Sequence, residues 1–123
     1  MKRQNNLGLM RYRKANKIAR QNLKKASEFL QKQEKESFFI EVSRALWGYL
    51  SHKFNIALSE LSIDTIEKQL AKHKISEETS GEFIQTLNEC EFARFAPGDS
   101  SQQMQHIYDK ALNIISKIEH ELR

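Results

Sequence analysis

Apolar residues recur every three or four positions along most of this chain, a spacing that places them on one side of an α-helix. Three long stretches show it: Met10 to Lys32, Ser37 to Phe54, and Ser100 to the C-terminus. Two shorter stretches, Ile63 to Lys74 and Ser76 to the segment around Phe92, show it as well. The pattern predicts an all-α fold, a compact single-domain bundle of four to five helices.

The predicted helix from Ser37 to Phe54 is apolar around most of its circumference. Its broad face holds most of the apolar side chains, and Ile40, Trp47 and Phe54 extend the apolar arc around the side. A helix of this kind is covered by neighbours on several sides, so we expect it to be central and Trp47 to be largely buried. The segment that follows, Asn55 to Leu61, is too short for a long helix, and we expect it to dock as an extended loop.

Residues that start and stop helices divide the second half of the chain. Ser62 and Ser76 are placed to cap the helices that follow them. Ser100 and Gln103 form a predicted capping box for the last helix. Pro97 disfavours helical geometry at the residue before it, so we expect the preceding helix to end there.

Length and charge set the expected domain organisation. At 123 residues the chain fits one domain, and its net charge of +4 is unevenly distributed. Residues 1–35 hold eleven Lys and Arg against two Glu, whereas the remainder is net acidic. We therefore expect a flexible basic flank at residues 1–9, a helical domain at residues 10–123, and an anionic partner near the N-terminus.

A row of basic residues stacks on the outer side of the first predicted helix, and we call it the basic ridge: Arg13, Lys17, Arg20 and Lys24. The row fits a membrane surface, since cytoplasmic flanks of membrane spans collect Lys and Arg. It also fits nucleic-acid phosphates, or solvent alone. Sequence-specific recognition of nucleic acid has little support, because few polar side chains on this helix could contact bases.

Candidate catalytic and metal-ligating residues do not converge in the sequence. The four His residues lie in separate elements or far apart, and the four Gly residues stand alone, so neither a metal site nor a phosphate-binding loop is predicted. Cys90 falls on the apolar stripe of its helix, as a small buried hydrophobe does. Glu89 and Glu91 point apart on a helix and do not form an acid–base pair. We predict that the chain is not an enzyme and uses no cofactor or metal.

The sequence shows no export or membrane signal of its own. No apolar stretch approaches the roughly 20 residues that cross a bilayer, and no apolar core follows the basic N-terminus as it does in a signal peptide. A single cysteine cannot form an intrachain disulfide. We expect the isolated chain to be soluble and to belong to a reducing compartment.

Three segments carry a family resemblance: RKANKIA at 13–19, ALWGYLSHKFNI at 45–56 and ECEFARFAPG at 89–98. In this order they resemble the C-terminal region of BatD proteins, which belong to the Bat aerotolerance group of bacteria such as Bacteroides. The resemblance covers the chain from about Arg11 to the C-terminus. Ala57 stands where the family pattern has a proline, a departure that affects the stiffness of the loop.

The resemblance implies a larger parent protein with an exported N-terminal portion, one membrane span, and this region on the cytoplasmic face of the inner membrane. It implies as partners Bat proteins with von Willebrand factor A domains and a MoxR-type ATPase, and a role in oxygen tolerance. It supplies no catalytic residues. We predict a non-enzymatic cytoplasmic protein-interaction domain whose basic ridge flanks the membrane. The alternative is a stand-alone helical domain that binds nucleic acid through the basic ridge.

A partner contact is predicted at the turn between the last two helices. We call the residues that could present a rigid surface there the partner corner: Arg94, Phe95, Pro97 and Asp99. The alternative is that Phe92 and Phe95 plug the end of the bundle while Arg94 pairs with a nearby carboxylate.

Overall fold

The computed structural model describes the backbone of residues 2–96, 98 and 101–122, and within these ranges the side chains from residue 17 onward. The described residues form five α-helices and one 3₁₀ turn, and no strand. In chain order these are α1 (Lys2–Gln31), α2 (Lys35–Phe54), η1 (Leu58–Glu60), α3 (Ile63–Lys72), α4 (Glu77–Phe95) and α5 (Ser101–Glu121). The predicted all-α single-domain bundle is confirmed.

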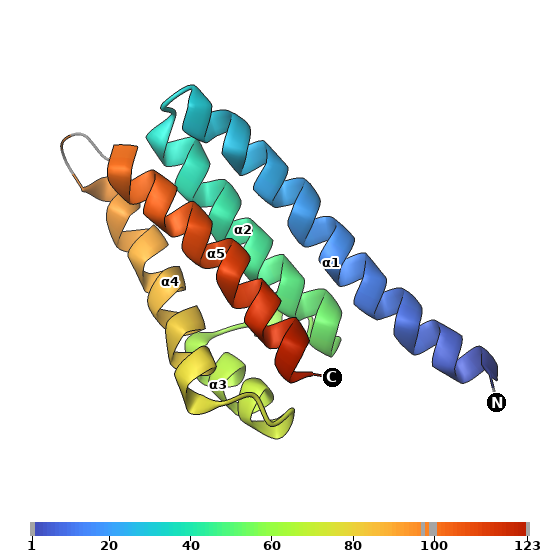
Figure 1. Cartoon of the computed structure of the whole chain (residues 1–123). Coiled ribbons are helices and arrows are strands. Elements are labelled where there is room, and N and C mark those ends of the chain that lie inside the picture. Colours follow the sequence, from blue (N-terminus) through green and yellow to red (C-terminus); the bar gives the residue numbers. More distant parts are fainter. Residues whose placement is uncertain (1, 97, 99–100, 123) are drawn as a thin grey trace.

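Two antiparallel helical hairpins make up the bundle (Figure 1). The first joins α1 and α2, the second joins α4 and α5, and α2 packs against α1, α4 and α5 alike. The short helix α3 packs against α4. The N-terminal part of α1 extends past the other helices (Figure 1). As the sequence predicts, α2 is the central helix.

The core is built around the apolar circumference of α2. Phe38 and Phe39 are fully buried, and their rings meet edge to face with centroids 5.1 Å apart, a favoured aromatic geometry. Each neighbouring helix adds a stripe at helical spacing. The buried residues of the stripes are Ala19, Leu23 and Ala26 of α1, Phe83, Leu87, Cys90 and Ala93 of α4, and Met104, Ile107, Ala111, Ile114 and Ile118 of α5.

The helix caps follow the sequence where the structure describes them. The side-chain oxygens of Ser62 and Ser76 accept hydrogen bonds from the backbone N–H groups of Thr65 and Thr79, both at 3.2 Å. Asn55 ends α2 in the left-handed conformation with φ 57°, which Asn tolerates better than most residues. The predicted capping box at Ser100 lies outside the described residues.

Hydrogen bonds join the two connections at one end of the bundle. The Lys35 ammonium group at the start of α2 donates to the carbonyl of Ala96, just after α4. The Ser101 hydroxyl at the start of α5 donates to the side chain of Gln33 at 2.5 Å. These bonds connect the turn between α1 and α2 with the end of α4 and the start of α5, and so hold the two hairpins together.

Two expectations about the elements were wrong. The first helix begins at Lys2 rather than Met10, because no proline interrupts residues 2–9 and a helix propagates easily once nucleated. The connection after α2 contains the turn η1 instead of being extended throughout. Trp47 packs against the core and is less completely buried than Phe38, since it lies at the edge of the α2 face that packs on the core.

The difference in burial between Phe38 and Trp47 predicts the cost of removing each. Phe38→Ala should lower the free energy of unfolding by about 4 kcal/mol, a usual loss for a fully buried aromatic residue. Trp47→Ala should cost clearly less, because part of the Trp47 side chain is in water in the folded state as well. Urea denaturation of both variants measures the two losses. A larger loss for Trp47→Ala would contradict the packing described here.

Candidate functional site

The outer side of α4 exposes aromatic side chains. Phe92 is 76% exposed and Phe95 is 72% exposed, whereas Phe83 and Leu87 of the same helix are buried in the core. At 100° per residue, Phe92 falls on the side of α4 opposite Phe83 and Leu87, and Phe95 falls about 60° from Phe92. Helix α4 therefore has apolar residues on two sides, and only one side is covered.

A shallow depression of about 430 Å³ adjoins the Phe92 ring. It is lined by Gly81, Ile84, Gln85, Asn88, Glu89, Phe92 and Gln103. We call the residues of α4 that share this side the α4 outer face: Ile84, Gln85, Asn88, Phe92 and Phe95. Large exposed apolar side chains that are grouped in this way are typical of protein-binding surfaces.

The described part of the partner corner lies at the C-terminal end of α4. The Arg94 guanidinium group stacks on the Phe95 ring at 4.8 Å from its centroid and lies 3.7 Å from the Glu91 carboxylate. The Nε atom of Arg94 is buried and has no hydrogen-bond partner among the residues that the structure describes. Pro97 and Asp99, the other two members of the corner, lie outside the described residues.

The alternative interpretation of this corner is half correct. Arg94 pairs with a nearby carboxylate, that of Glu91, as the alternative expected. Phe92 and Phe95 do not plug the end of the bundle, because both rings are largely in solvent. The aromatic surface therefore extends beyond the predicted corner to Phe92.

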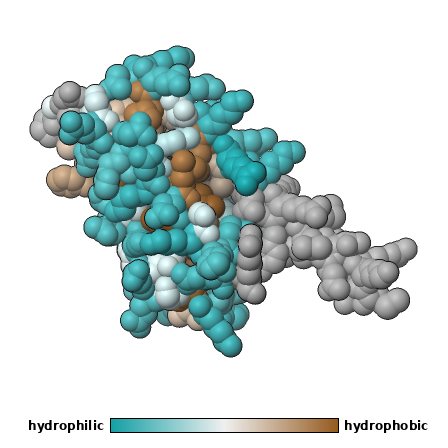
Figure 2. All heavy atoms as spheres, viewed as in Figure 1, coloured by the Kyte–Doolittle hydropathy of each residue, from teal (hydrophilic) through white to brown (hydrophobic). Residues whose placement is uncertain are grey.

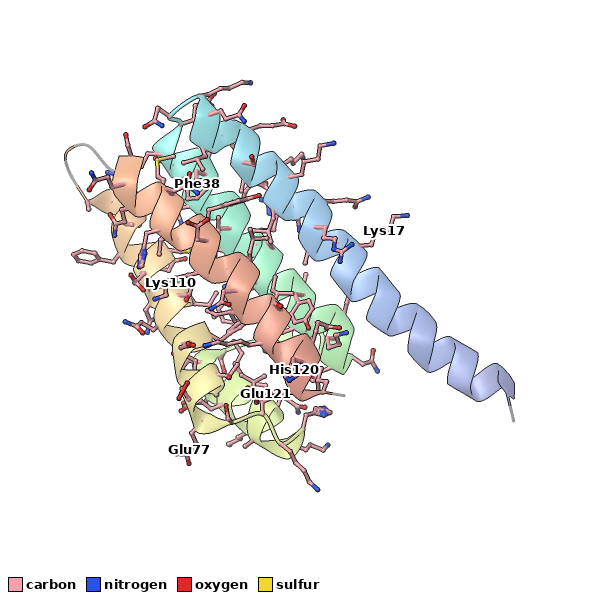
Figure 3. The ribbon with its side chains drawn as sticks, in the orientation of Figure 1. Lys17, Phe38, Glu77, Lys110, His120 and Glu121 are labelled. Carbon is pink, nitrogen blue, oxygen red and sulfur yellow. The ribbon has the colours of Figure 1, made fainter. Side chains whose placement is uncertain are left out.

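The basic ridge lies on α1, on the other side of the bundle from α4 (Figure 1). Lys17, Arg20 and Lys24 are exposed, and Figure 3 shows Lys17 pointing away from the neighbouring helices. The side chain of Arg13 is outside the described residues. The described members of the basic ridge and of the partner corner lie on α1 and at the end of α4, so the structure does not bring them together.

A groove between α1 and α5 is a second candidate site, which sequence analysis missed. It has a volume of about 410 Å³ and is lined by Ala19, Arg20 and Leu23 of α1 and by Leu112, Ile115, Ser116, Glu119 and His120 of α5. We call it the α1–α5 groove. Figure 2 shows a hydrophobic strip running beside α5, with hydrophilic residues along its edges. Its walls come from opposite ends of the chain, so no local pattern predicts it.

An ion pair with a buried lysine holds the Glu119 carboxylate in place. The Lys53 ammonium group of α2 is buried and lies 2.5 Å from Glu119, which also accepts a hydrogen bond from the Tyr49 hydroxyl. The Lys53 ammonium group also lies 5.6 Å from the centroid of the Tyr49 ring. Burial lowers the pKa of Lys53, and the nearby Glu119 carboxylate partly opposes this shift. In the sequence both residues resemble ordinary solvated charges.

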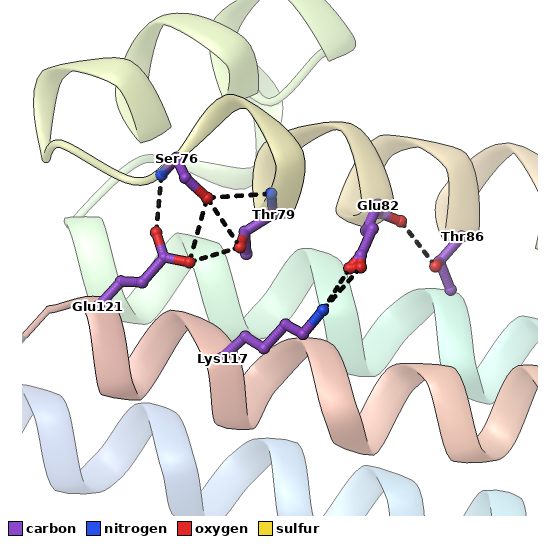
Figure 4. A network of polar contacts seen from close by, with 6 residues as sticks. All are labelled: Ser76, Thr79, Glu82, Thr86, Lys117 and Glu121. Atoms are coloured by element: carbon purple, nitrogen blue, oxygen red, sulfur yellow. Dashed lines mark hydrogen bonds and ion pairs between the residues drawn. The ribbon is translucent and has the colours of Figure 1, made fainter.

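A second polar network joins the end of α5 to the start of α4 (Figure 4). The Glu121 carboxylate accepts hydrogen bonds from the Ser76 backbone N–H at 2.7 Å and from the Thr79 hydroxyl at 2.5 Å. These bonds lower the pKa of Glu121. One turn along each helix, Lys117 contacts Glu82 at 2.7 Å. The carboxylate thus acts as an additional N-terminal cap for α4.

Cys90 and His73 both make packing contacts inside the fold. Cys90 is fully buried, which confirms its predicted place in the core. Burial, followed by the charges of Glu89 and Glu91, raises the pKa of the Cys90 thiol to about 12. The His73 ring stacks on Phe54 with centroids 4.3 Å apart. Within the described ranges, no group of three or more His, Cys, Asp and Glu side chains could hold a metal ion.

Comparison with known proteins finds no match to a family model, a curated protein or a solved structure. The resemblance to BatD proteins therefore depends on the three sequence segments alone. None of the helices, as far as the structure describes them, is long and apolar enough to span a membrane.

The raised pKa of Cys90 predicts an unreactive thiol. In the folded protein at pH 8, Cys90 should react with Ellman's reagent far more slowly than a free cysteine, because little thiolate forms and the side chain is buried. Unfolding in guanidinium chloride should restore full reactivity. Absorbance measurements follow both reactions, and rapid labelling of the native protein would contradict the buried position.

The lowered pKa of Glu121 predicts a pH-dependent contribution to stability. Since the folded-state pKa lies below the ordinary value of 4.5, the carboxylate stabilises the fold fully above that value. The contribution is lost as the pH falls through the folded-state pKa. Glu121→Gln should lower the free energy of unfolding at pH 7 by about 1 kcal/mol, a typical loss for a helix cap, and the difference from wild type should shrink as the pH falls below 4.5.

Thermal and urea unfolding from pH 7 to pH 3 measures this difference. Glu67→Gln, at an exposed site on α3, serves as the control. A pH-independent difference between Glu121→Gln and wild type would contradict the capping role of the carboxylate.

Proposed function

We propose that this chain is a non-enzymatic protein-interaction domain, the cytoplasmic module of a BatD-like membrane protein linked to oxygen tolerance. The single observation that supports this most strongly is the exposure of Phe92 and Phe95 on the α4 outer face. Water contact with two large aromatic rings one turn apart is unfavourable, and covering them with a partner would recover that free energy.

The resemblance adds support from an independent direction. One of its three segments, Glu89 to Gly98, contains both exposed rings and Arg94. The segment from Ala45 to Ile56 instead lies mostly in α2 and supplies core residues such as Leu46. The BatD-like sequence thus includes both the scaffold of the bundle and the surface that we propose for partner binding.

The partners that we propose are those implied by the resemblance, namely the Bat proteins with von Willebrand factor A domains and the MoxR-type ATPase. The basic ridge would lie near anionic lipid headgroups beside a preceding membrane span, where each basic residue contributes about 1 kcal/mol. Nucleic-acid binding through the basic ridge is the second candidate, favoured by the exposure of Lys17, Arg20 and Lys24. We prefer protein binding because nucleic-acid binding leaves the two exposed rings without a role.

Replacing both rings tests the proposed function. The double variant Phe92→Ser/Phe95→Ser should lower the capture of the companion Bat proteins or of the ATPase at least tenfold in a pull-down. Its melting temperature should stay near that of wild type, because the rings are exposed in the folded state. Leu58→Ser is the matched control, since Leu58 is 65% exposed and belongs to η1 and not to α4. Full capture by the double variant would refute the assignment of the α4 outer face.

A further inference from the structure

We propose that the α1–α5 groove binds an acidic amphipathic helix of a partner protein, laid along the line where α1 and α5 meet. The inference deepens the proposed function, on which it rests, by naming the chemistry of one partner segment and a second surface that receives it. It follows from three features of the groove: an apolar floor, a basic rim and a concave shape.

The groove has an apolar floor whose exposed part comes from α5. Ala19 and Leu23 of α1 are buried, whereas Leu112 on the α5 side is 45% exposed. The small side chain of Ala19 leaves room between the helices, and Ile115 borders the same space. The apolar face of an amphipathic helix, with side chains at positions i, i+3, i+4 and i+7, fits a groove between two helices.

The charges around the groove favour an acidic partner. Arg20 stands on the α1 rim, and the exposed Lys24 continues the basic ridge one turn along α1. Glu119 is the carboxylate among the lining residues, and Lys53 compensates its charge from the α2 side. Complementary charge across an interface speeds association and selects the partner.

The same features disfavour a membrane as the occupant. A helix that lies in a lipid surface inserts its apolar face, but the apolar stripe of α1 at Ala19, Leu23 and Ala26 is already buried in the core. A flat lipid surface could contact the basic ridge, yet it could not fill the space beside Leu112. A helix that enters the groove would contact both α1 and α5.

A synthetic peptide tests the proposal with the intact chain. The probe is a fluorescently labelled helix of about 18 residues, roughly 27 Å long, with Leu on one face and Glu elsewhere. We expect saturable binding by fluorescence anisotropy. Leu112→Glu should weaken binding at least tenfold, because it places a carboxylate at the rim of the apolar floor. Leu58→Glu, the matched control on η1, should leave the affinity unchanged.

Charge reversal separates recognition from nonspecific adhesion. The variant Arg20→Glu/Lys24→Glu should bind the acidic peptide at least tenfold more weakly and should bind a matched peptide with Lys in place of Glu more tightly than wild type does. Equal binding of a scrambled peptide, or no effect of Leu112→Glu, would overturn the proposal. So would binding to phosphatidylglycerol vesicles without binding to the peptide, or self-association that depends on Leu112.

The failure of this proposal can be told apart from failure of the proposed function. The double variant Phe92→Ser/Phe95→Ser should bind the acidic peptide as wild type does, because the α4 outer face is on another side of the bundle. If the peptide does not bind wild type while the double variant still fails to capture the companion proteins, only the assignment of the α1–α5 groove is refuted. If Leu112→Glu abolishes companion capture and the double variant does not, the result supports the α1–α5 groove as a binding surface and refutes the assignment of the α4 outer face.

Discussion

The burial of α2 is the constraint on which the rest of the structure depends. Its apolar residues cover so much of the helix circumference that no single neighbour could remove them from water. Helices α1, α4 and α5 each cover one sector, and each uses its own apolar stripe to do so. Because α1 is committed mainly to α2, it leaves a gap beside α5, and its basic side stays in solvent. The groove and the basic ridge are thus by-products of how the central helix is covered.

The charge pair of Lys53 and Glu119 connects core packing with surface chemistry. Burying an ammonium group is costly, so Lys53 needs a carboxylate in a fixed place, and Glu119 supplies it from α5. A slide of α5 along α2 would break this pair, which therefore helps to set the register of the two helices. Lys53 also neutralises the charge of Glu119, so the net charge of the groove lining is more positive than its residues alone suggest.

Local sequence patterns predict the elements of this fold and little of its surface. Capping by Ser62 and Ser76 and the position of Cys90 depend on neighbours within one helix, and the sequence shows those neighbours directly. The groove depends on side chains from α1 and α5 that meet only after folding.

The exposed rings are an intermediate case. A helical projection of α4 places Phe92 opposite Phe83, so a signal for an outward aromatic face is present in the sequence. The neighbouring Phe95, together with Arg94, already belongs to the partner corner predicted from the sequence. Whether another element covers such a face depends on contacts outside that helix, and the sequence is also compatible with closure of the bundle end by these rings.

The Glu121 cap has a consequence for how the domain opens. The Ser76 amide before α4 and the Thr79 hydroxyl in its first turn both donate to Glu121, the last residue of α5. The start of α4 and the end of α5 are therefore held by the same hydrogen bonds. Fraying of the last turn of α5 would expose the Ser76 amide and loosen α4 at its start. Native-state hydrogen exchange would then report these two ends as one subglobal opening unit, although α4 and α5 are separate helices.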